Sequence, residues 1–309
     1  MSSPPLRGVL PVLEVPFTPD ERLDLDGFHT VIAAQVAAGV EAVMFPGFAS
    51  EFHKLAGDER RLLTTELLAA LATAREASAT APRTIVSISD HATAVAVREA
   101  SWAVEAGADA INLLPPFLFG PSPEAIDAHL RAVLRAVDPV PVVLQHAPGQ
   151  TGGAVTVGGL TAIAEDHPNL RTVKVESQPP GKLVAALSRA DPPLHTLVGY
   201  AGLHAIEAYE RGAVGIQPGC SFPELYVTLD RRWRDGDHQG ARALHRTMLP
   251  YLSAWMQHVE LIVAVEKVIS VARGWFASAT VRAPGWQLDA AEHALIDRFL
   301  EEFDPWLAS

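Results

Sequence analysis

The feature that most constrains this chain is one pair of elements repeated between Gly8 and Gln217. Each repeat has a short apolar run that reads as a strand, then a turn, then apolar residues at helical spacing. The predicted strands are Val9–Pro16, Glu41–Phe45, Thr84–Ser89, Ala110–Leu114, Pro141–His146, Leu170–Glu176, Leu194–Gly199 and Ala213–Gln217. The predicted helices between them are Gly27–Ala38, one that begins near Asp58, Ala92–Ala106, Pro123–Val137, Val157–Glu165, Gly181–Arg189 and Leu203–Arg211.

Eight such pairs, with strands apolar on both faces, are typical of a (β/α)8 TIM barrel in the α/β class. Gly39 and Gly107 stand where a helix would end before the next strand, as C-cap glycines do. A doubly wound open sheet normally has fewer strands, and no glycine fingerprint for a dinucleotide follows the first strand. The barrel is therefore the predicted fold.

The alternation stops after Gln217, and helical spacing alone continues. The predicted helices there are Phe222–Arg234, Asp237–Met256, Glu260–Arg273 and Asp289–Phe303. We therefore predict a barrel over residues 1–220 and a C-terminal helical extension, packed on the barrel, over residues 221–309.

Composition limits the partners. A net charge of -12 disfavours nucleic acid and anionic membranes. No apolar run approaches the ~20 residues that cross a bilayer. Cys220 is the only cysteine, which excludes a disulfide framework and a thiolate zinc cluster. No secretory signal opens the chain, so we expect a cytoplasmic protein. We also expect that it uses no cofactor.

The run Leu170–Glu176 holds one of only four lysines among 24 lysine and arginine residues. Its period of two puts Thr172, Lys174 and Glu176 on one face. A lysine near the carboxyl end of a buried strand needs a partner or a function, and desolvation favours the neutral, nucleophilic amine. Two interpretations stand: Lys174 is a nucleophile, or it is salt-bridged to Glu176 and points at solvent.

In a barrel, catalytic groups stand at the carboxyl ends of the strands and on the loops that follow. Residues at these ends include Phe48, Ala49, Ser50, Glu51, His91, Phe117, Gln145, His146, Glu176, Tyr200 and Gln217. An amine with histidines and carboxylates at one mouth is suited to proton transfer.

These residues carry a resemblance that extends over roughly Gly8 to Arg273. Its landmarks are residues 16–19 (Pro-Phe-Thr-Pro), residues 47–51, residues 148–152 (Pro-Gly-Gln-Thr-Gly) and Lys174. In this order they resemble the dihydrodipicolinate synthase/N-acetylneuraminate lyase family, class I aldolase-type barrels. The resemblance implies that Lys174 forms a Schiff base, and that the chain is a homo-oligomer, a dimer or a tetramer.

The departures from the family pattern argue against a true dihydrodipicolinate synthase. The family's threonine and tyrosine relay is replaced here by Phe48, Ala49, Pro116, Phe117 and Gln145, and its carboxylate-binding arginine by Gln150. His146 stands where the family has an asparagine. What remains is imine chemistry with a different acid and base. We therefore expect a Schiff-base lyase that acts on a 2-oxo acid or related ketone, by aldol-type C–C cleavage or condensation or by dehydration.

The expected catalytic residues are Lys174, His146 and Gln145, with His146 as the first choice for the proton shuttle. Strand alternation opposes that choice: if Gln145 faces the barrel centre, His146 points away unless the strand end bends. The expected substrate-binding residues are Phe48, Ala49, Ser50, His91, Phe117, Glu176, Tyr200 and Gln217. For Tyr200 a packing role is an equal alternative, and Glu51 is expected to anchor its loop by accepting backbone N–H groups.

Two rival functions remain open. His91, His146, Glu51 and Glu176 offer nitrogen and oxygen ligands for a metal-dependent hydrolase or lyase, although none has a metal-site spacing. Loss of the relay also fits a catalytically inactive descendant that binds a keto acid or a protein partner. The sequence leaves the substrate unnamed.

Overall fold

The structure, a computed structural model, describes residues 5–78, 80–153 and 155–307. Contacts between Cα atoms divide the chain into two compact units. The first unit consists of Met1–Arg7 and Arg83–Gln217, and the second of Gly8–Pro82 and Pro218–Ser309. This division does not test the predicted boundary after residue 220, which stays a prediction.

The strands form one eight-stranded sheet in the order β1-β8-β7-β6-β5-β4-β3-β2. They are β1 Gly8–Val9, β2 Ala42–Phe45, β3 Arg83–Ile88, β4 Ala110–Leu113, β5 Val142–His146, β6 Leu170–Val175, β7 His195–Val198 and β8 Gly215–Ile216. The pairs from β3 to β8 are parallel. Since β1 is the neighbour of β8 and the others follow in sequence order, the predicted (β/α)8 barrel is confirmed.

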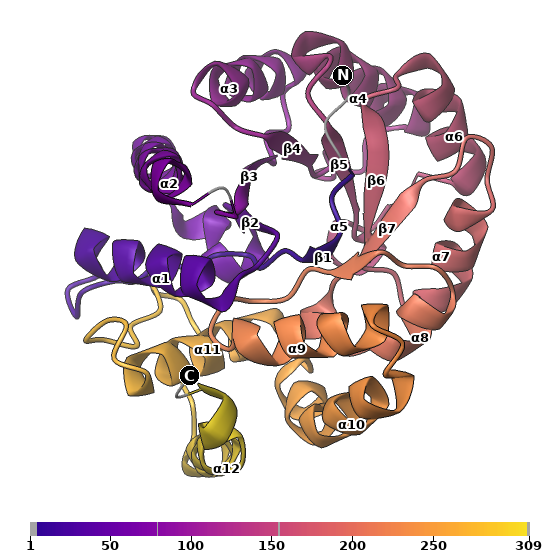
Figure 1. Cartoon of the computed structure of the whole chain (residues 1–309). Coiled ribbons are helices and arrows are strands. Elements are labelled where there is room, and N and C mark those ends of the chain that lie inside the picture. The colour runs from indigo at the N-terminus through magenta and orange to yellow at the C-terminus, as the bar shows by residue number, and fades with distance from the viewer. Residues whose placement is uncertain (1–4, 79, 154, 308–309) are drawn as a thin grey trace. The chain divides into compact units, whose positions relative to one another are not determined.

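In the first unit, helices line the outer face of β3 to β8 (Figure 1). They are α3 Thr93–Glu105, α4 Pro123–Val137, α6 Val157–Asp166, α7 Gly181–Ser188 and α8 Ala205–Glu210. The unit also holds the short α5 Pro148–Thr151 after β5 and the 3-10 turn η3 Tyr200–Gly202 after β7. Ser122 and Thr156 cap α4 and α6 by accepting backbone N–H bonds at 3.3 and 3.1 Å. The short α5 lies in a segment that the sequence pattern did not predict as helix.

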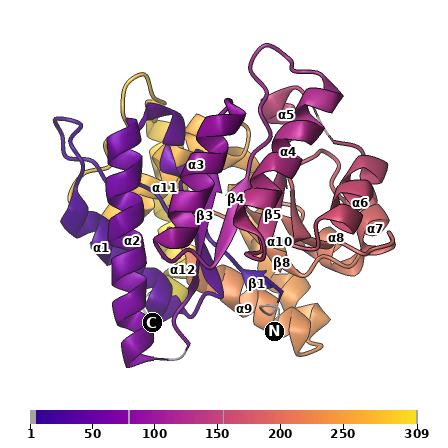
Figure 2. The ribbon, with the colours of Figure 1, turned by 90° about the horizontal axis from the view of Figure 1, so that it is seen from above.

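The second unit holds η1 Phe48–Ser50, η2 Phe52–Lys54, α1 Leu25–Ala38, α2 Gly57–Ala77, α9 Pro223–Arg234, α10 His238–Trp255, α11 Val259–Ala272 and α12 Ala290–Leu307. Figure 2 shows α1 beside α2, and α3 beside α4 in the first unit. The predicted C-cap Gly39 ends α1 at a φ of 70°, in the left-handed region.

The predicted first strand is longer than β1. Pro11 has no backbone N–H and interrupts the ladder. Its carbonyl still accepts from the Met44 N–H at 2.8 Å, and the Leu13 N–H donates to the Met44 carbonyl at 3.0 Å. The residues after β1 therefore pair with β2 through separate hydrogen bonds. These bonds connect the first and the last strand of the order given above.

Aromatic side chains hold the C-terminal helices together. Phe299 of α12 lies 5.0 Å from Phe222, next to α9, and 5.1 Å from Trp255 of α10 between ring centroids. All three are at most 1% exposed. Edge-on aromatic pairs at these distances stabilise a core beyond the apolar area that they bury.

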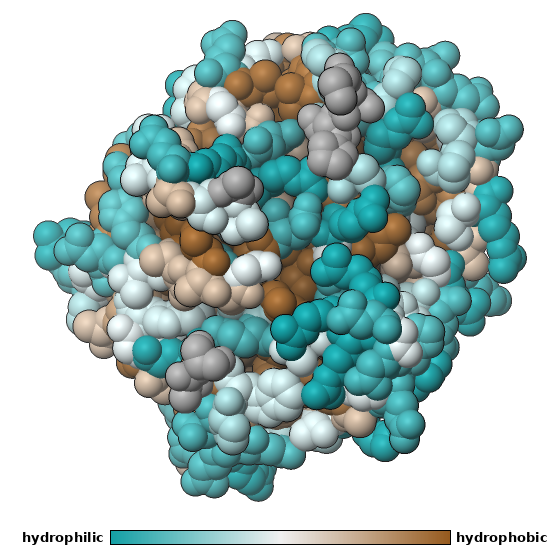
Figure 3. Space-filling model, in the orientation of Figure 1, coloured by the Kyte–Doolittle hydropathy of each residue, from teal (hydrophilic) through white to brown (hydrophobic). Residues whose placement is uncertain are grey.

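Hydrophilic residues predominate on the face in Figure 3, where apolar residues show in separate patches. Phe119 and Leu118, after β4, are the most exposed large apolar side chains among the described residues, at 102% and 55%. No helix within the described ranges is both long and apolar enough to span a membrane.

Two of the carboxyl groups buried in the second unit are those of Glu14 and Glu266. Glu14 accepts a hydrogen bond from the Ser270 hydroxyl, and Glu266 accepts the Cys220 backbone N–H at 3.0 Å. A β-carbon at Gly219 would overlap the Glu266 carboxylate, so glycine is needed there. Burial raises the pKa of Glu14 to about 7 and that of Glu266 to about 8; the negative charge of Glu51 raises the first further, and that of Glu14 raises the second.

We expect the free energy of unfolding to fall as pH rises from about 5 to about 8. The folded protein keeps protons on Glu14 and Glu266 that the unfolded chain releases near pH 4.5, so stability is fully present below that pH and is lost as pH rises through the folded values. Between pH 5 and 8 the wild type should lose roughly 3 kcal/mol more than Glu14→Gln. Urea unfolding at both pH values measures this, with exposed Glu76→Gln as control; equal pH dependence in all three proteins would contradict it.

Candidate active site

Lys174 is buried in the first unit. Its side chain on β6 is 4% exposed, and its Nζ lies 3.3 Å from Glu176 Oε1. The predicted shared face of Lys174 and Glu176 is confirmed by this contact. The second interpretation of the sequence was right about the ion pair and wrong about solvent, because both side chains lie inside the protein.

A chain of hydrogen bonds extends from this pair across the neighbouring strands. Gln145 Nε2 on β5 donates to Glu176 Oε2 at 2.7 Å. Asn112 Nδ2 on β4 donates to Gln145 Oε1 at 3.0 Å and to Ser87 Oγ on β3 at 2.8 Å. We call Lys174, Glu176, Gln145, Asn112 and Ser87 the polar chain. It gives one oxygen of Glu176 an ammonium partner and the other an amide donor.

Strand register builds the polar chain. Gln145 is the register partner of Lys174 across β5 and β6, and Ser87 is that of Asn112 across β3 and β4. In parallel strands, side chains at matched positions point to the same face. Asn112 and Ser87 are bonded at matched positions, whereas Gln145 bonds to Glu176 and Asn112 at positions shifted along the neighbouring strands. These bonds satisfy groups that would be costly to bury alone.

Gly199 leaves the space that Glu176 occupies. It follows β7, and a β-carbon there would lie 2.5 Å from Glu176 Cγ and 2.7 Å from Glu176 Oε1. Real β-carbons do not come so close to their neighbours. The glycine thus allows the carboxylate to lie against the backbone, turned toward Lys174 and Gln145.

The hydrogen bonds that define the polar chain do not include His146. His146 lines a cavity of about 120 Å³ that the polar-chain residue Gln145 also lines, together with Phe117, Thr151 and Val155. Burial lowers the pKa of His146 below its ordinary value, which favours the neutral imidazole at pH 7. The catalytic role predicted for it stays a prediction.

Other predicted residues form separate pairs. The Phe117 backbone N–H donates to His91 Nδ1 at 3.3 Å, and the two rings pack edge-on at 4.7 Å. Tyr200 accepts a hydrogen bond from Gln150 Nε2 at 2.8 Å. Tyr200 and Ala201 both have positive φ, near 50°, a strained conformation for residues with a β-carbon. Gln217 is buried beyond β8, and its backbone N–H bonds to the Val198 carbonyl.

Phe48, Ala49 and Ser50 belong to the second unit, in η1. The Ser50 hydroxyl donates to the Leu13 carbonyl and accepts the Gly47 N–H at 2.9 Å, so it stabilises the turn. The Phe48 ring packs edge-on against that of Phe52. Their predicted contact with substrate stays a prediction.

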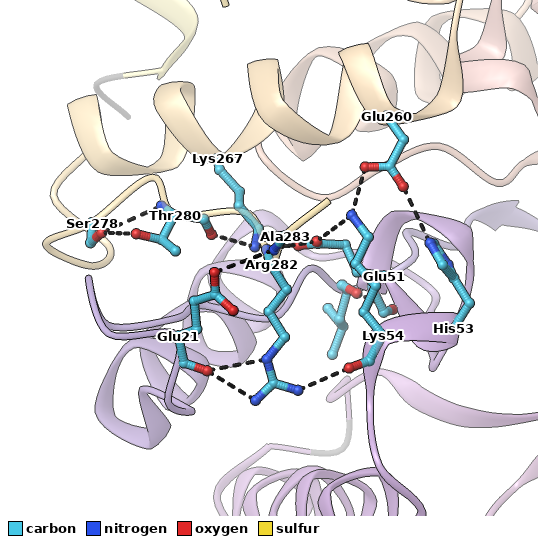
Figure 4. A network of polar contacts seen from close by, with 12 residues as sticks. Glu21, Glu51, His53, Lys54, Glu260, Lys267, Ser278, Thr280, Arg282 and Ala283 are labelled. Atoms are coloured by element: carbon cyan, nitrogen blue, oxygen red, sulfur yellow. Dashed lines mark hydrogen bonds and ion pairs between the residues drawn. The ribbon is translucent and has the colours of Figure 1, made fainter. Parts of the chain in front are cut away.

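Glu51 anchors its loop, as predicted. Its Oε2 accepts the Arg282 backbone N–H at 3.1 Å, and its Oε1 lies 2.5 Å from Lys267 Nζ (Figure 4). Lys54 adds a third donor at 3.1 Å. The carboxylate thus joins the loop after β2 to α11 and the segment after it, within the second unit.

The metal interpretation gains no support from geometry. No group of three or more histidine, cysteine, aspartate or glutamate residues is arranged to hold a metal ion within the described ranges. Two of its four suggested ligands have other partners: Glu51 binds lysines, and Glu176 binds Lys174 and Gln145.

The sequence pattern missed Asn112, Ser87 and Gly199. Asn112 interrupts the apolar run Ala110–Leu113, and a buried amide in such a strand is a signal in itself. The partners of Asn112 depend on the register between strands, which the pattern of a single strand does not contain. Gly199 gives no signal until the position of Glu176 is known.

A family model described as the dihydrodipicolinate synthetase family matches residues 5–302. The chain belongs to this family. A member of similar sequence is an uncharacterized DapA-like lyase of Halobacterium salinarum, 30% identical over 96% of this chain and 94% of its own. Another is YagE of Escherichia coli, named as a putative 2-dehydro-3-deoxy-D-gluconate aldolase, 25% identical over 96% of each chain. These family members are lyases by name.

Solved structures of the family share the fold. A putative dihydrodipicolinate synthetase from Pseudomonas aeruginosa superposes with a TM-score of 0.87 at 28% identity, over 96% of this chain and 99% of its own. The structure of YagE, in complex with pyruvate, gives 0.85 at 24% identity over 96% and 98%. The family resemblance predicted from the sequence is therefore confirmed.

Gly199→Ala is expected to lower the free energy of unfolding by about 1–3 kcal/mol, because the added methyl overlaps Glu176. Gly158→Ala is the matched control: it lies inside α6 with nothing within 4 Å of the new carbon, so it should be neutral or stabilising. Chemical denaturation measures both. In a double-mutant cycle, Glu176→Ala should relieve the cost of Gly199→Ala; strictly additive effects would contradict the overlap.

Proposed function

We propose that this protein is a lyase that joins Lys174 to a carbonyl substrate as a Schiff base. The observation that carries the proposal is the buried Lys174 amine held 3.3 Å from the Glu176 carboxylate. Membership of a family that contains aldolases supports it. An amine must lose its proton before it attacks a carbonyl, and a carboxylate at this distance is a ready acceptor.

The first step makes a carbon–nitrogen bond. The lone pair of the free amine attacks the carbonyl carbon, the carbonyl oxygen leaves as water with the two amine hydrogens, and one further proton gives the protonated imine. This cation draws electrons from the neighbouring bonds. Imine formation is common to C–C cleavage, condensation and dehydration, which are the reactions expected from the sequence.

Glu176 is the proton carrier that the contacts favour. After imine formation it would accept a proton from the carbon next to the imine carbon. The C–H electron pair then forms a C=C bond, and the imine π pair returns to nitrogen as an enamine. In C–C cleavage Glu176 would instead take the proton of the hydroxyl whose carbon is released as an aldehyde. Gln145 acts as a positioning residue, since its amide fixes the second carboxylate oxygen.

Trapping with cyanoborohydride tests the covalent step. A panel of 2-oxo acids, ketones and aldehydes should leave a reduced adduct on Lys174, located by peptide mass spectrometry. Lys174→Ala should abolish the adduct, because no other amine in the polar chain can form it. Lys182→Ala, at an exposed lysine of α7, should leave it unchanged. Absence of an adduct with every compound would contradict the proposal and favour a binding protein.

Exchange of substrate protons for solvent deuterium tests the role of Glu176. For a ketone that is trapped on Lys174, Glu176→Gln should slow the exchange by about 10²-fold or more, the usual contribution of a general base, while trapping continues. Glu105→Gln, at an exposed glutamate of α3, serves as the control. If His146→Gln slows the exchange and Glu176→Gln does not, His146 is the proton carrier.

Two expectations from the sequence are retained as part of this proposal. They are assembly as a homodimer or homotetramer, which light scattering tests, and a cytoplasmic location. The ligand expected in this proposal is a small carbonyl compound.

A further inference from the structure

We infer that the cavity beside the end of β5 receives an apolar chain of the carbonyl substrate, so that the protein selects 2-oxo acids with such a chain over pyruvate. The inference rests on the proposed Schiff base at Lys174. It leaves the reacting carbonyl group and its carboxylate as they are, and it names the part of the substrate that gives specificity.

The lining of this cavity is apolar and uncharged. The cavity lies in the first unit, where the segment after β4, helix α4 and the end of β5 with its following loop contribute to the wall. Its apolar lining residues include Pro116, Phe117, Pro121, Ile126, Leu144 and Val155. Among the described residues that line it, none is a lysine, arginine, aspartate or glutamate. Such a surface favours an apolar group, because a charged group would lose its hydration there without gaining a partner.

Three polar side chains in the lining do not change this character. The Thr151 hydroxyl donates to the Ala147 carbonyl at 2.9 Å, and the Gln145 amide donates to Glu176 Oε2 at 2.7 Å. His146 is buried, and burial lowers its pKa, which favours the neutral imidazole at pH 7. The lining therefore offers no charge to which a charged substituent could bind.

The volume of the cavity sets the size of the group that it can hold. It measures about 120 Å³. An apolar cavity of roughly 150 Å³ in another protein binds benzene, so in proportion this one holds about five carbons. Protein interiors leave few voids larger than a water molecule, and an unfilled apolar cavity is destabilising. At the carboxyl end of a barrel strand, where substrates bind, a ligand group that fills the cavity explains its size better than loose packing does.

Glycines in the lining leave a path into the cavity. Gly120, Gly152 and Gly153 all line it. A β-carbon added at any of these glycines would have no other atom within 4 Å. Open space therefore adjoins the lining at these three positions, and a substrate chain can enter without displacing side chains.

Gln145 connects the cavity with the site of imine formation. It lines the cavity, it is the register partner of Lys174, and its amide holds Glu176. Neighbouring strands lie about 4.8 Å apart, so the wall of the cavity and the nucleophile are separated by one strand spacing. A substrate joined to Lys174 through its carbonyl carbon would thus bring a chain of a few carbons within reach of the cavity.

A series of straight-chain 2-oxo acids tests the inference, because its members differ only in apolar length. The series is pyruvate, 2-oxobutanoate, 2-oxohexanoate, 2-oxooctanoate and 2-oxodecanoate. Each forms the imine with loss of one water, and cyanoborohydride then adds hydride to the imine carbon to leave a secondary amine on Lys174. Mass spectrometry measures the trapping rate of each acid below saturation. Division by the rate with Nα-acetyl-lysine corrects for intrinsic reactivity.

The corrected rate of the wild type should rise with chain length to a maximum at least tenfold above pyruvate, since each methylene that enters an apolar pocket gains about fourfold. It should fall again for chains that exceed the cavity. Ile126→Ala enlarges the cavity and should move the maximum to a longer chain, whereas Ile126→Phe fills it and should move the maximum to a shorter one. Ile126 lies on α4, outside the polar chain, so both variants keep the reacting groups.

Leu62→Ala, at an exposed leucine of α2, is the control and should keep the wild-type maximum. Because chain lengths are compared within one variant, a general loss of reactivity cancels.

The outcomes separate this inference from the proposed function. Corrected rates that do not rise with chain length overturn the inference, while an adduct on Lys174 still supports the Schiff base. A maximum that stays in place in both Ile126 variants shows that the chain binds elsewhere and overturns the role of the cavity. No adduct with any member of the series, or with any compound of the wider panel, overturns the proposed function and the inference together.

Discussion

The ion pair between Lys174 and Glu176 is the interaction on which the site depends. Removing two charges from water is costly, and their mutual attraction offsets the cost only when the remaining hydrogen-bonding groups are satisfied. Gln145 supplies the donor that the second oxygen of Glu176 needs, and Asn112 in turn holds Gln145. Gly199 leaves room for Glu176, because a β-carbon at this position would overlap the Glu176 side chain. Four strands and one loop therefore cooperate to keep a single carboxylate in place.

Because the Lys174–Glu176 pair is supported by single residues at the ends of neighbouring strands, one barrel can support different reactions. Parallel strands deliver their carboxyl ends to one end of the sheet, so an exchange of single residues there changes the chemistry without changing the fold. In this chain the end of β5 carries an amide, Gln145, that hydrogen-bonds to the acid beyond β6. The family defines the architecture, and the chemistry that we propose depends on the residues around Lys174.

The second unit treats its buried acids in two ways. Glu51 has Lys267, Lys54 and a backbone N–H as partners, so its charge is compensated. Glu14 and Glu266 have no cationic hydrogen-bond partner of this kind in the described contacts, and burial raises the pKa of each toward or above neutral pH. Both arrangements avoid an uncompensated charge in the interior. The first fixes a loop, whereas the second makes stability depend on pH.

The sequence by itself determined the alternation of strands and helices and hence the barrel. Apolar residues recur along the sequence at a spacing that differs between buried strands and amphipathic helices, so each element can be identified from the sequence alone. It also determined that Lys174 and Glu176 share a face, since alternation within one strand is local. It missed the break at Pro11 and the short α5, where backbone bonding departs from the apolar pattern. Only the tertiary structure decided that Glu176 is buried and that Gln145 and Asn112 are its support. Those facts depend on the register between strands far apart in sequence, and no periodicity encodes that register.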